Sequence, residues 1–174
     1  MTGPTPAHHR PGAAPPFTQR TPRVVAARRL HRRRDREAAR RFLAEGPQAV
    51  REALGTPGTV HELFATAAAT TRYADLTGAA GAQGVPVSVV TDDGLAALAE
   101  TVAPQGLVAV CAHLDISLAA ALAGPPALVA VLADVRDPGN AGTILRTADA
   151  AGAAAVVFAG DAVDPYNGKC VRAS

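Results

Sequence analysis

The chain of 174 residues has few aromatic side chains and few cysteines. It contains no Trp, and aromatic residues make up only 3% of it. Its two cysteines, Cys111 and Cys170, lie far apart in the sequence and lack the spacing of metal ligands. The sequence therefore predicts neither a disulfide framework nor a zinc site. We expect a protein without a metal, in the reducing environment of the cytoplasm.

Long apolar runs are also missing, although hydrophobic residues make up 48% of the chain. No run approaches the roughly 20 apolar residues that a membrane-spanning helix needs. The N-terminus carries Pro, His and Arg where a signal peptide would be apolar. Membrane partners are therefore not expected. Ala supplies much of the apolar content, so the core must form by close approach of backbones.

Basic charge is concentrated at the N-terminal end of the chain. Residues 1–41 hold 11 Arg and two acidic residues, a charge of +9, whereas the remaining residues carry −7. A basic arm on an acidic body is typical of proteins that bind polyanions. A coding bias toward Arg and Ala is the alternative, but the clustering favours nucleic-acid contact. The candidate contacts in this arm are Arg32, Arg33 and Arg34.

Composition and periodicity divide the chain into five segments. Helical and strand patterns alternate after the arm, which predicts small sheets covered by helices. The pair Pro125-Pro126 cannot continue a helix and marks a boundary. The segments are a disordered tail (1–20), a basic helical arm (21–40), a small α/β domain (41–114), a linker (115–126) and an incomplete second α/β domain (127–174).

The second α/β domain begins with a fully apolar strand, ALVAVLADV, of the kind that is buried on both faces of a parallel sheet. A loop, a helix and another apolar strand follow. A right-handed crossover makes the two strands parallel. Ligands in such sheets bind beyond the carboxyl ends of the strands, which is where the loop Asp134–Gly139 lies.

The helix after this loop carries the candidate chemistry. Asn140 is suited to cap the helix, and Gly142 and Arg146 are four residues apart and share one face. A cation beside a bare backbone patch at a helix N-terminus suits an approaching phosphate. In the alternative, Asn140 is only a cap, Gly142 permits helix–sheet packing and Arg146 is solvated. These residues alone do not separate the two interpretations.

The ordered string Asn140-x-Gly142-x-x-x-Arg146-Thr147-Ala148 resembles the first signature motif of the SpoU (TrmH-like) branch of the SPOUT RNA methyltransferases. The stretch Asp161–Ser174 resembles the family's D-x-x-D-x-Y-N-x-K-x-x-R-A-S segment. Upstream, RFLAEGPQAVREAL and TVAPQGLVAV resemble parts of a small substrate-binding domain related to ribosomal protein L30e. In combination the resemblance covers roughly residues 20–174.

The resemblance implies a fold and a reaction. The fold is an L30e-like α/β substrate-binding domain followed by the first part of a SPOUT (α/β knot) methyltransferase domain. The reaction moves a methyl group from S-adenosylmethionine to a ribose 2′-hydroxyl of structured RNA, rRNA rather than tRNA and 23S rRNA in particular. Arg146 and Asn140 would be catalytic. Because an Arg side chain stays protonated, we expect Arg146 to stabilise alkoxide charge rather than act alone as a base.

Further RNA contacts are expected in and after the same motif, at Gly142, Lys169, Arg172 and Ser174. The alternative is that Asp164-Pro165 and Asn167-Gly168 are turns, with Lys169 and Arg172 solvated at the start of a helix. We expect Tyr166 to be a packing residue. Glu45 and Gln105 lie at strand–loop junctions, where they either dock RNA or shape turns.

The family's later motifs, which form the knot, the donor pocket and much of the homodimer interface, would lie beyond Ser174. We therefore expect the cofactor site to lie downstream, and the 174-residue chain to be a fragment inactive by itself. A two-stranded sheet would also leave half of its apolar surface uncovered. The alternative function is a non-catalytic RNA-binding module. A dinucleotide-binding domain is disfavoured, since DPGNAG lacks the G-x-G-x-x-G pattern.

Overall fold

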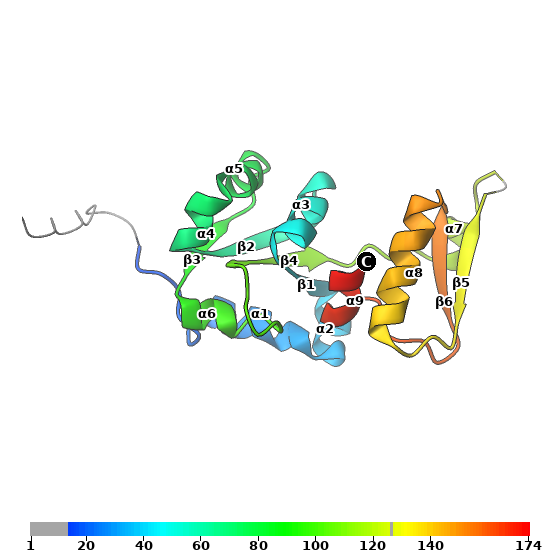
Figure 1. Ribbon diagram of the computed structural model, residues 1–174, viewed down its shortest axis with the longest axis horizontal. Coiled ribbons are helices and arrows are strands. Elements are labelled where there is room, and N and C mark those ends of the chain that lie inside the picture. Colours follow the sequence, from blue (N-terminus) through cyan, green and yellow to red (C-terminus); the bar gives the residue numbers. More distant parts are fainter. Residues whose placement is uncertain (1–13, 126) are drawn as a thin grey trace, which may run out of the picture.

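The structure is a computed structural model that describes residues 14–125 and 127–174. The chain forms two α/β units that lie side by side (Figure 1). The first contains a mixed four-stranded sheet, and the second contains two parallel strands. The last helix, α9 (Gly168–Ala173), lies between them and contacts both α8 of the second unit and β1 of the first.

The sheet of the first unit has the strand order β1-β4-β2-β3. β4 pairs antiparallel with both β1 and β2, and β2 pairs parallel with β3. Alternate residues of a strand point to opposite faces. Because consecutive residues of β1, β2 and β4 are apolar and buried, both faces of this sheet are apolar. The strands are β1 (Arg41–Glu45), β2 (Val60–Thr66), β3 (Val87–Val90) and β4 (Leu107–Ala112).

Each face of this sheet is covered by helices and has its own core. On one face Leu63 and Ala109 meet Val50 and Leu76. On the other face Phe64 and Val108 meet residues from the N-terminal helices and α6. The first face is covered by α3 (Pro47–Gly55), α4 (Ala67–Arg72) and α5 (Ala74–Ala82), and the second by α1 (Pro22–Arg28), the 3-10 turn η1 (Arg29–His31) and α6 (Asp92–Ala96).

The basic arm is helical as predicted, but it is an integral part of the first unit. Val24, Ala27 and Leu30 are buried against the sheet, as their helical spacing indicates. The helix is broken into α1, η1 and α2 (Arg33–Ala39). Arg36 is also buried, unlike the candidate RNA contacts Arg32, Arg33 and Arg34.

The predicted disordered tail reaches too far into the chain. Phe17 forms a parallel bridge with Val90, donating its N–H to the carbonyl of Val89 and accepting from the N–H of Thr91. Residues 14–20 are therefore ordered against the edge strand β3. The prediction for residues 1–13 lies outside the described residues.

The second unit consists of β5 (Val129–Ala133), α8 (Pro138–Ala150), β6 (Ala155–Ala159) and α9. β5 and β6 pair in parallel, as the crossover rule predicts. The prediction that β5 is buried on both faces is wrong. Leu132 is buried toward α8 and α9, whereas Val131 on the opposite face is 62% exposed, because no described residue covers that face.

The two units are joined covalently by residues 113–128, which include the short helix α7 (Leu118–Ala121). Several large apolar side chains in and beside this connection are exposed, among them Leu114, Ile116 and Leu128. Across residues 14–125 and 127–174, no helix combines the length and the apolar character needed to cross a bilayer.

Candidate functional site

The N-terminus of α8 is held by Asp137. This residue is the N-cap, and its Oδ1 accepts the N–H of Asn140 at 2.8 Å. The prediction that Asn140 caps the helix is therefore wrong, since Asn140 is the third residue of the helix. The N–H of Asn140, and next the ammonium of Lys169 at 3.3 Å, lower the pKa of Asp137. Asn140 itself is exposed.

Gly142 lies on the buried side of α8, where α9 crosses it. A Cβ placed at this position would clash with the carbonyl oxygen of Cys170 and lie 2.7 Å from Cβ of Ala173. The expected bare backbone patch for a phosphate is therefore wrong for this structure, since α9 covers it. Gly142 instead permits close packing of α8 on α9, whereas the alternative drawn from the sequence was packing of the helix on the sheet.

Arg146 lies one turn after Gly142 and is exposed. Within the described ranges 14–125 and 127–174, its guanidinium has no hydrogen-bond or ion-pair partner. Arg146 and Asn140 thus leave five guanidinium donors and an amide on the solvent side of one helix. Both residues that were predicted to be catalytic are therefore accessible to a ligand.

The residues predicted on α9 have different environments. Lys169 is exposed and reaches Asp137. Arg172 is 29% exposed and bridges two carboxylates, that of Glu45 at 3.2 Å and that of Glu100 at 3.3 Å. The hydroxyl of Ser174 donates to the carbonyl of Val171 at 2.9 Å. Lys169 therefore resembles a surface contact, whereas Arg172 is already engaged within the molecule.

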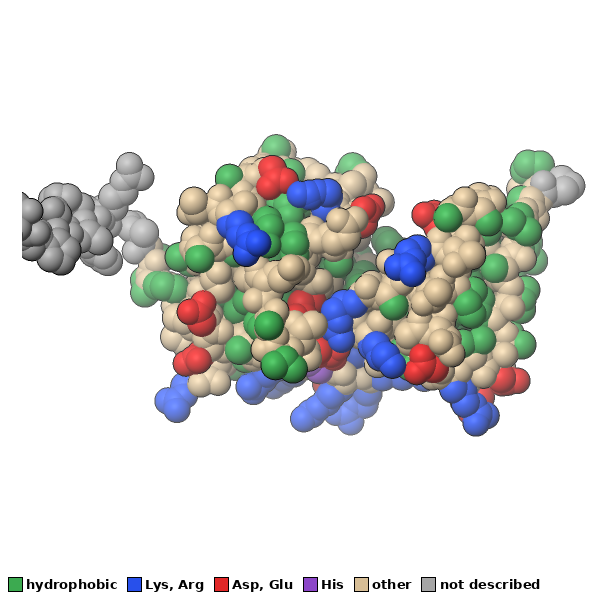
Figure 2. Space-filling model, in the orientation of Figure 1, with side chains coloured by type: hydrophobic (Ala, Val, Ile, Leu, Met, Phe, Trp, Pro, Cys, Tyr) green, Lys and Arg blue, Asp and Glu red, His purple; other side chains and the backbone are tan. Residues whose placement is uncertain are grey.

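The arm residues predicted to contact RNA are all exposed. Arg33 pairs with Glu37 at 2.7 Å, one helical turn away, and Arg34 lies 3.8 Å from Asp35. Arg32 has no ion-pair partner within the described part of the chain. Exposed pairs of this kind contribute little stability, so their guanidinium groups can exchange partners readily. Lys and Arg side chains gather along the lower edge of the molecule in Figure 2.

Glu45 and Gln105 lie close to one another at one end of the first sheet. Glu45 accepts hydrogen bonds from the N–H of Glu100 at 2.9 Å and from the hydroxyl of Thr101. A Cβ at Gly46, whose φ is +91°, would lie 3.3 Å from the side-chain oxygen of Gln105. Both residues thus shape turns. Next to them lies an open groove of about 330 Å³, lined by Thr66, Ala68, Ala69, Arg72, Asp92, Leu95, Pro104, Gln105 and Gly106.

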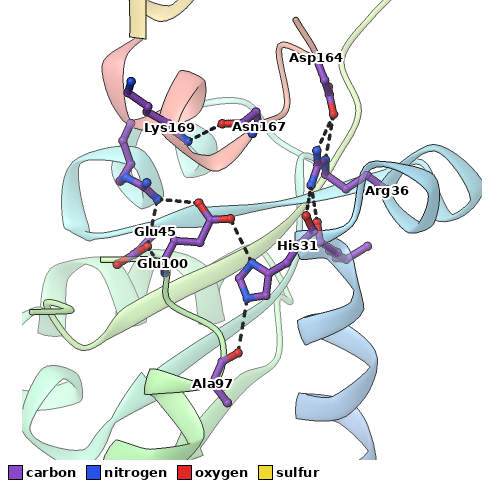
Figure 3. A network of polar contacts seen from close by, with 10 residues as sticks. His31, Arg36, Glu45, Ala97, Glu100, Asp164, Asn167 and Lys169 are labelled. Carbon is purple, nitrogen blue, oxygen red and sulfur yellow. Dashed lines mark hydrogen bonds and ion pairs between the residues drawn. The ribbon is translucent and has the colours of Figure 1, made fainter. Parts of the chain in front are cut away.

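A set of contacts between the units was not predicted from the sequence. The Tyr166 ring stacks on His113 with 3.8 Å between centroids and lies 4.8 Å from Phe42. Asp164 forms an ion pair with Arg36 at 2.6 Å. Figure 3 shows this pair beside the network that joins His31, Glu100 and Glu45. The sequence signalled only the Asp-Pro-Tyr-Asn turn, and not the residues that receive it.

The site offers no candidate metal centre in the described residues, because no three His, Cys, Asp or Glu side chains converge there. The accessible chemistry is cationic: the guanidinium of Arg146, the ammonium of Lys169 and the exposed Arg side chains at the start of α2. Exposed cations of this kind suit an anionic polymer such as RNA.

Comparison with known proteins identifies both units. Residues 21–109 match the MRM3-like substrate binding domain, and residues 127–174 match the SpoU rRNA methylase family. Two curated relatives are a 23S rRNA (guanosine(2553)-2′-O)-methyltransferase of Bacillus subtilis and an uncharacterised tRNA/rRNA methyltransferase of Synechocystis. They are 37% and 35% identical over 84% and 88% of the chain.

Solved structures give the same result. An AdoMet-bound rRNA methyltransferase from Sinorhizobium meliloti superimposes with a TM-score of 0.77 at 30% identity, covering 91% of this chain and 59% of that one. The SpoU methyltransferase AviRb from Streptomyces viridochromogenes gives 0.72 at 26% identity, covering 88% of this chain and 57% of that one. The chain spans 55% of the length of each curated relative. The chain belongs to the proteins with an MRM3-like substrate binding domain, and this domain is followed by sequence that matches the SpoU rRNA methylase family.

Proposed function

We propose that this chain is the RNA-recognising part of a ribose 2′-O-methyltransferase that acts on rRNA, with 23S rRNA as the substrate. The support comes from the 23S rRNA methyltransferase of Bacillus subtilis and from the substrate-binding domain that precedes the SpoU sequence. We also propose a cytoplasmic location and, for the complete enzyme, a homodimer.

The observation that carries the proposal is the exposure of Arg146 and Asn140 on the same helix. A guanidinium keeps its proton at any physiological pH. Arg146 therefore cannot act alone as the base that deprotonates a 2′-hydroxyl. It can bind the adjoining phosphate and stabilise the negative charge that develops on the ribose oxygen during methyl transfer.

The other charged residues assist by contacting phosphates. Arg32, Arg33 and Arg34 lie on the arm, and Lys169 lies beside the N-terminus of α8. Each supplies a cation that releases counterions when RNA binds. Arg172 and Ser174 are proposed as weaker contacts, since both have partners within the molecule. We assign no RNA contact to Gly142, because α9 covers it.

The methyl donor of the family is S-adenosylmethionine, but the described residues do not fit it. The loops that follow β5 and β6 are closed against each other. Asp134 accepts the N–H of Asp161 at 2.8 Å, and the N–H of Val163 donates to the carbonyl of Val135 at 2.9 Å. These bonds occupy the strand ends where a ligand of a parallel sheet would bind. Calorimetry should detect no micromolar binding of S-adenosylmethionine to this chain.

RNA binding by the 174-residue chain tests the proposal. Fluorescence anisotropy with fragments of 23S rRNA should give saturable binding that is tighter than binding to tRNA. Arg146→Ala should weaken the affinity roughly tenfold to a hundredfold, since one phosphate contact with a charged donor contributes about 1.5–3 kcal/mol. The control is Arg136→Ala, which removes another exposed charge, one that pairs with Asp161.

The same measurement at several salt concentrations shows how many phosphates the protein neutralises. Replacing Arg32, Arg33 and Arg34 together by Ala should reduce the slope of log affinity against log salt by about 0.7–0.9 for each phosphate that is no longer neutralised. Equal decreases in affinity for Arg146→Ala and Arg136→Ala would contradict the assigned site. Tighter binding to tRNA would contradict the assigned substrate.

A further inference from the structure

The two units are connected by a single covalent crossing, which follows β4. Ala112 ends β4, and β5 begins at Val129. Residues 161–174 follow β6 and return to the first unit, where they pack against β1 through non-covalent contacts. The orientation of the units therefore depends on what this returning segment contacts.

Tyr166 in the returning segment holds the first residues of the crossing. Its hydroxyl accepts the N–H groups of Leu114 at 2.7 Å and of Asp115 at 2.9 Å, and it donates to Oδ1 of Asp115 at 2.9 Å. A tyrosine hydroxyl has one hydrogen and two acceptor positions, so these three bonds use its full capacity. The backbone that leaves β4 thus has a fixed direction.

The Tyr166 ring is fixed as firmly as its hydroxyl. It lies at 10° to the His113 ring, and Phe42 of β1 packs close to it. The His113 side chain is only 4% exposed, and neither ring nitrogen has a hydrogen-bond partner within residues 14–125 and 127–174. The imidazole is therefore held mainly by packing, with the Asp115 carboxylate 3.7 Å from its Nδ1. Its position therefore depends on the ring that covers it.

Asp164, two residues earlier, fixes the same segment to the basic arm. Its carboxylate accepts from Nε of Arg36 at 3.1 Å and from one terminal nitrogen at 2.6 Å. The other terminal nitrogen of Arg36 donates to the carbonyl groups of Leu30 and His31, both at 2.8 Å. The side chains of Arg36 and Asp164 are only 5% and 12% exposed. This geometry admits one arrangement of the arm and the returning segment.

We infer that Tyr166 and Asp164 form a domain clamp that positions α8 relative to the basic arm for RNA binding. Both are positioning residues. Tyr166 fixes the backbone that leaves β4, and Asp164 fixes α2 through its ion pair with Arg36. The inference rests on the proposed function, because it concerns the relative placement of Arg146 and of Arg32–Arg34. Without the clamp, an RNA that contacts both sets would first have to order the two units, which costs affinity.

NMR relaxation of the 17.6 kDa chain tests the clamp without RNA. Backbone amides of both units should report one rotational correlation time in the wild-type protein. In Tyr166→Phe, which keeps the ring stack but removes three hydrogen bonds, and in Asp164→Asn, the units should report separate, shorter times. The control is Asp161→Asn, which changes a carboxylate of the same segment that pairs only within the second unit.

RNA titrations of the same variants test the positioning role. Tyr166→Phe should weaken affinity for an rRNA fragment about threefold to tenfold while the salt slope stays unchanged, because every cation that faces a phosphate is still present. A residue with a purely structural role would lower the melting temperature and leave affinity unaltered in the folded range. Asp161→Asn should leave both the affinity and the correlation time at wild-type values.

Two results would overturn the inference. One is a single correlation time in both Tyr166→Phe and Asp164→Asn. The other is an unchanged RNA affinity in variants whose units tumble separately. If the wild-type chain bound no RNA although its units tumbled together, the proposed function would fail, whereas the clamp itself would stand as a structural feature without a role in RNA binding.

Discussion

Replacing Gly142 by Ala tests the packing of α8 on α9 directly. In the interior of a helix this substitution ordinarily stabilises a protein by about 0.5–1 kcal/mol, because Gly has more conformational freedom to lose. At position 142 the new methyl group would meet the carbonyl oxygen of Cys170 and lie 2.7 Å from Cβ of Ala173. Both obstacles belong to α9, and one of them is backbone.

The magnitude follows from two opposing effects. Overpacking of a well-packed contact costs about 1–3 kcal/mol, and the backbone obstacle places Gly142→Ala in the upper part of that range. After the helical gain is subtracted, we expect a net destabilisation of about 1–2 kcal/mol. For a chain of this size each kcal/mol lowers the melting temperature by about 2–4 °C.

A matched control lies in the first unit of the chain. Gly78 occupies the interior of α5, and a Cβ there would have no heavy atom within 4 Å. Gly78→Ala should therefore stabilise by about 0.5–1 kcal/mol. Urea unfolding followed by circular dichroism measures both variants. If Gly142→Ala were as stabilising as Gly78→Ala, α9 would not pack on α8 as the structure shows, and the rejection of an open phosphate site at Gly142 would lose its basis.

Two further predictions concern titratable groups. Burial, and next the charge of Arg40, lower the pKa of His113 from its usual 6.5, so the folded protein binds fewer protons than the unfolded chain just below this value. Stability should therefore fall as pH drops below about 6.5, and urea midpoints of His113→Phe should show a weaker dependence on pH there; an identical dependence would refute the assignment. Burial also raises the thiol pKa values of Cys111 to about 12 and of Cys170 to about 11. Neither thiol should react with Ellman's reagent at pH 8 until guanidinium unfolds the chain, and rapid labelling of the native protein would contradict this burial.

Local patterns predicted the elements well where one face of a helix or strand had to be buried. The basic arm was expected to be helical, and it is helical, with Val24, Ala27 and Leu30 buried at helical spacing. The apolar runs around Leu132 and Val157 marked two parallel strands. Such patterns depend on neighbours within a few residues, so a single sequence contains them.

Contacts between distant residues could not be predicted in this way. Nothing near Arg36 indicates a partner at Asp164, and nothing near Tyr166 indicates the ring of His113. The prediction of the N-cap of α8 was wrong for a different reason. Asp137 and Asn140 are both good capping residues, and Pro138 at the first helical position, which favours Asp137, was the signal that the prediction of Asn140 neglected.

The candidate site was predicted in part. Arg146 and Asn140 are accessible, as the roles proposed for them would require, but the environments of Gly142 and Arg172 depend on α9. That helix is the last part of the returning segment, whose direction cannot be read from local spacing. The motif thus indicated which residues belong together, whereas the structure shows which of them face solvent.

The ion pair between Arg36 and Asp164 also constrains the order in which the chain can fold during synthesis. The two residues are 128 positions apart. Residues 21–112 can form both cores of the first sheet as soon as they leave the ribosome, and domains generally fold in this order. The Arg36 guanidinium then has no counterion until residue 164 emerges. Burying an unpaired charge is costly, so α2 should dock last, when the second unit is already being completed.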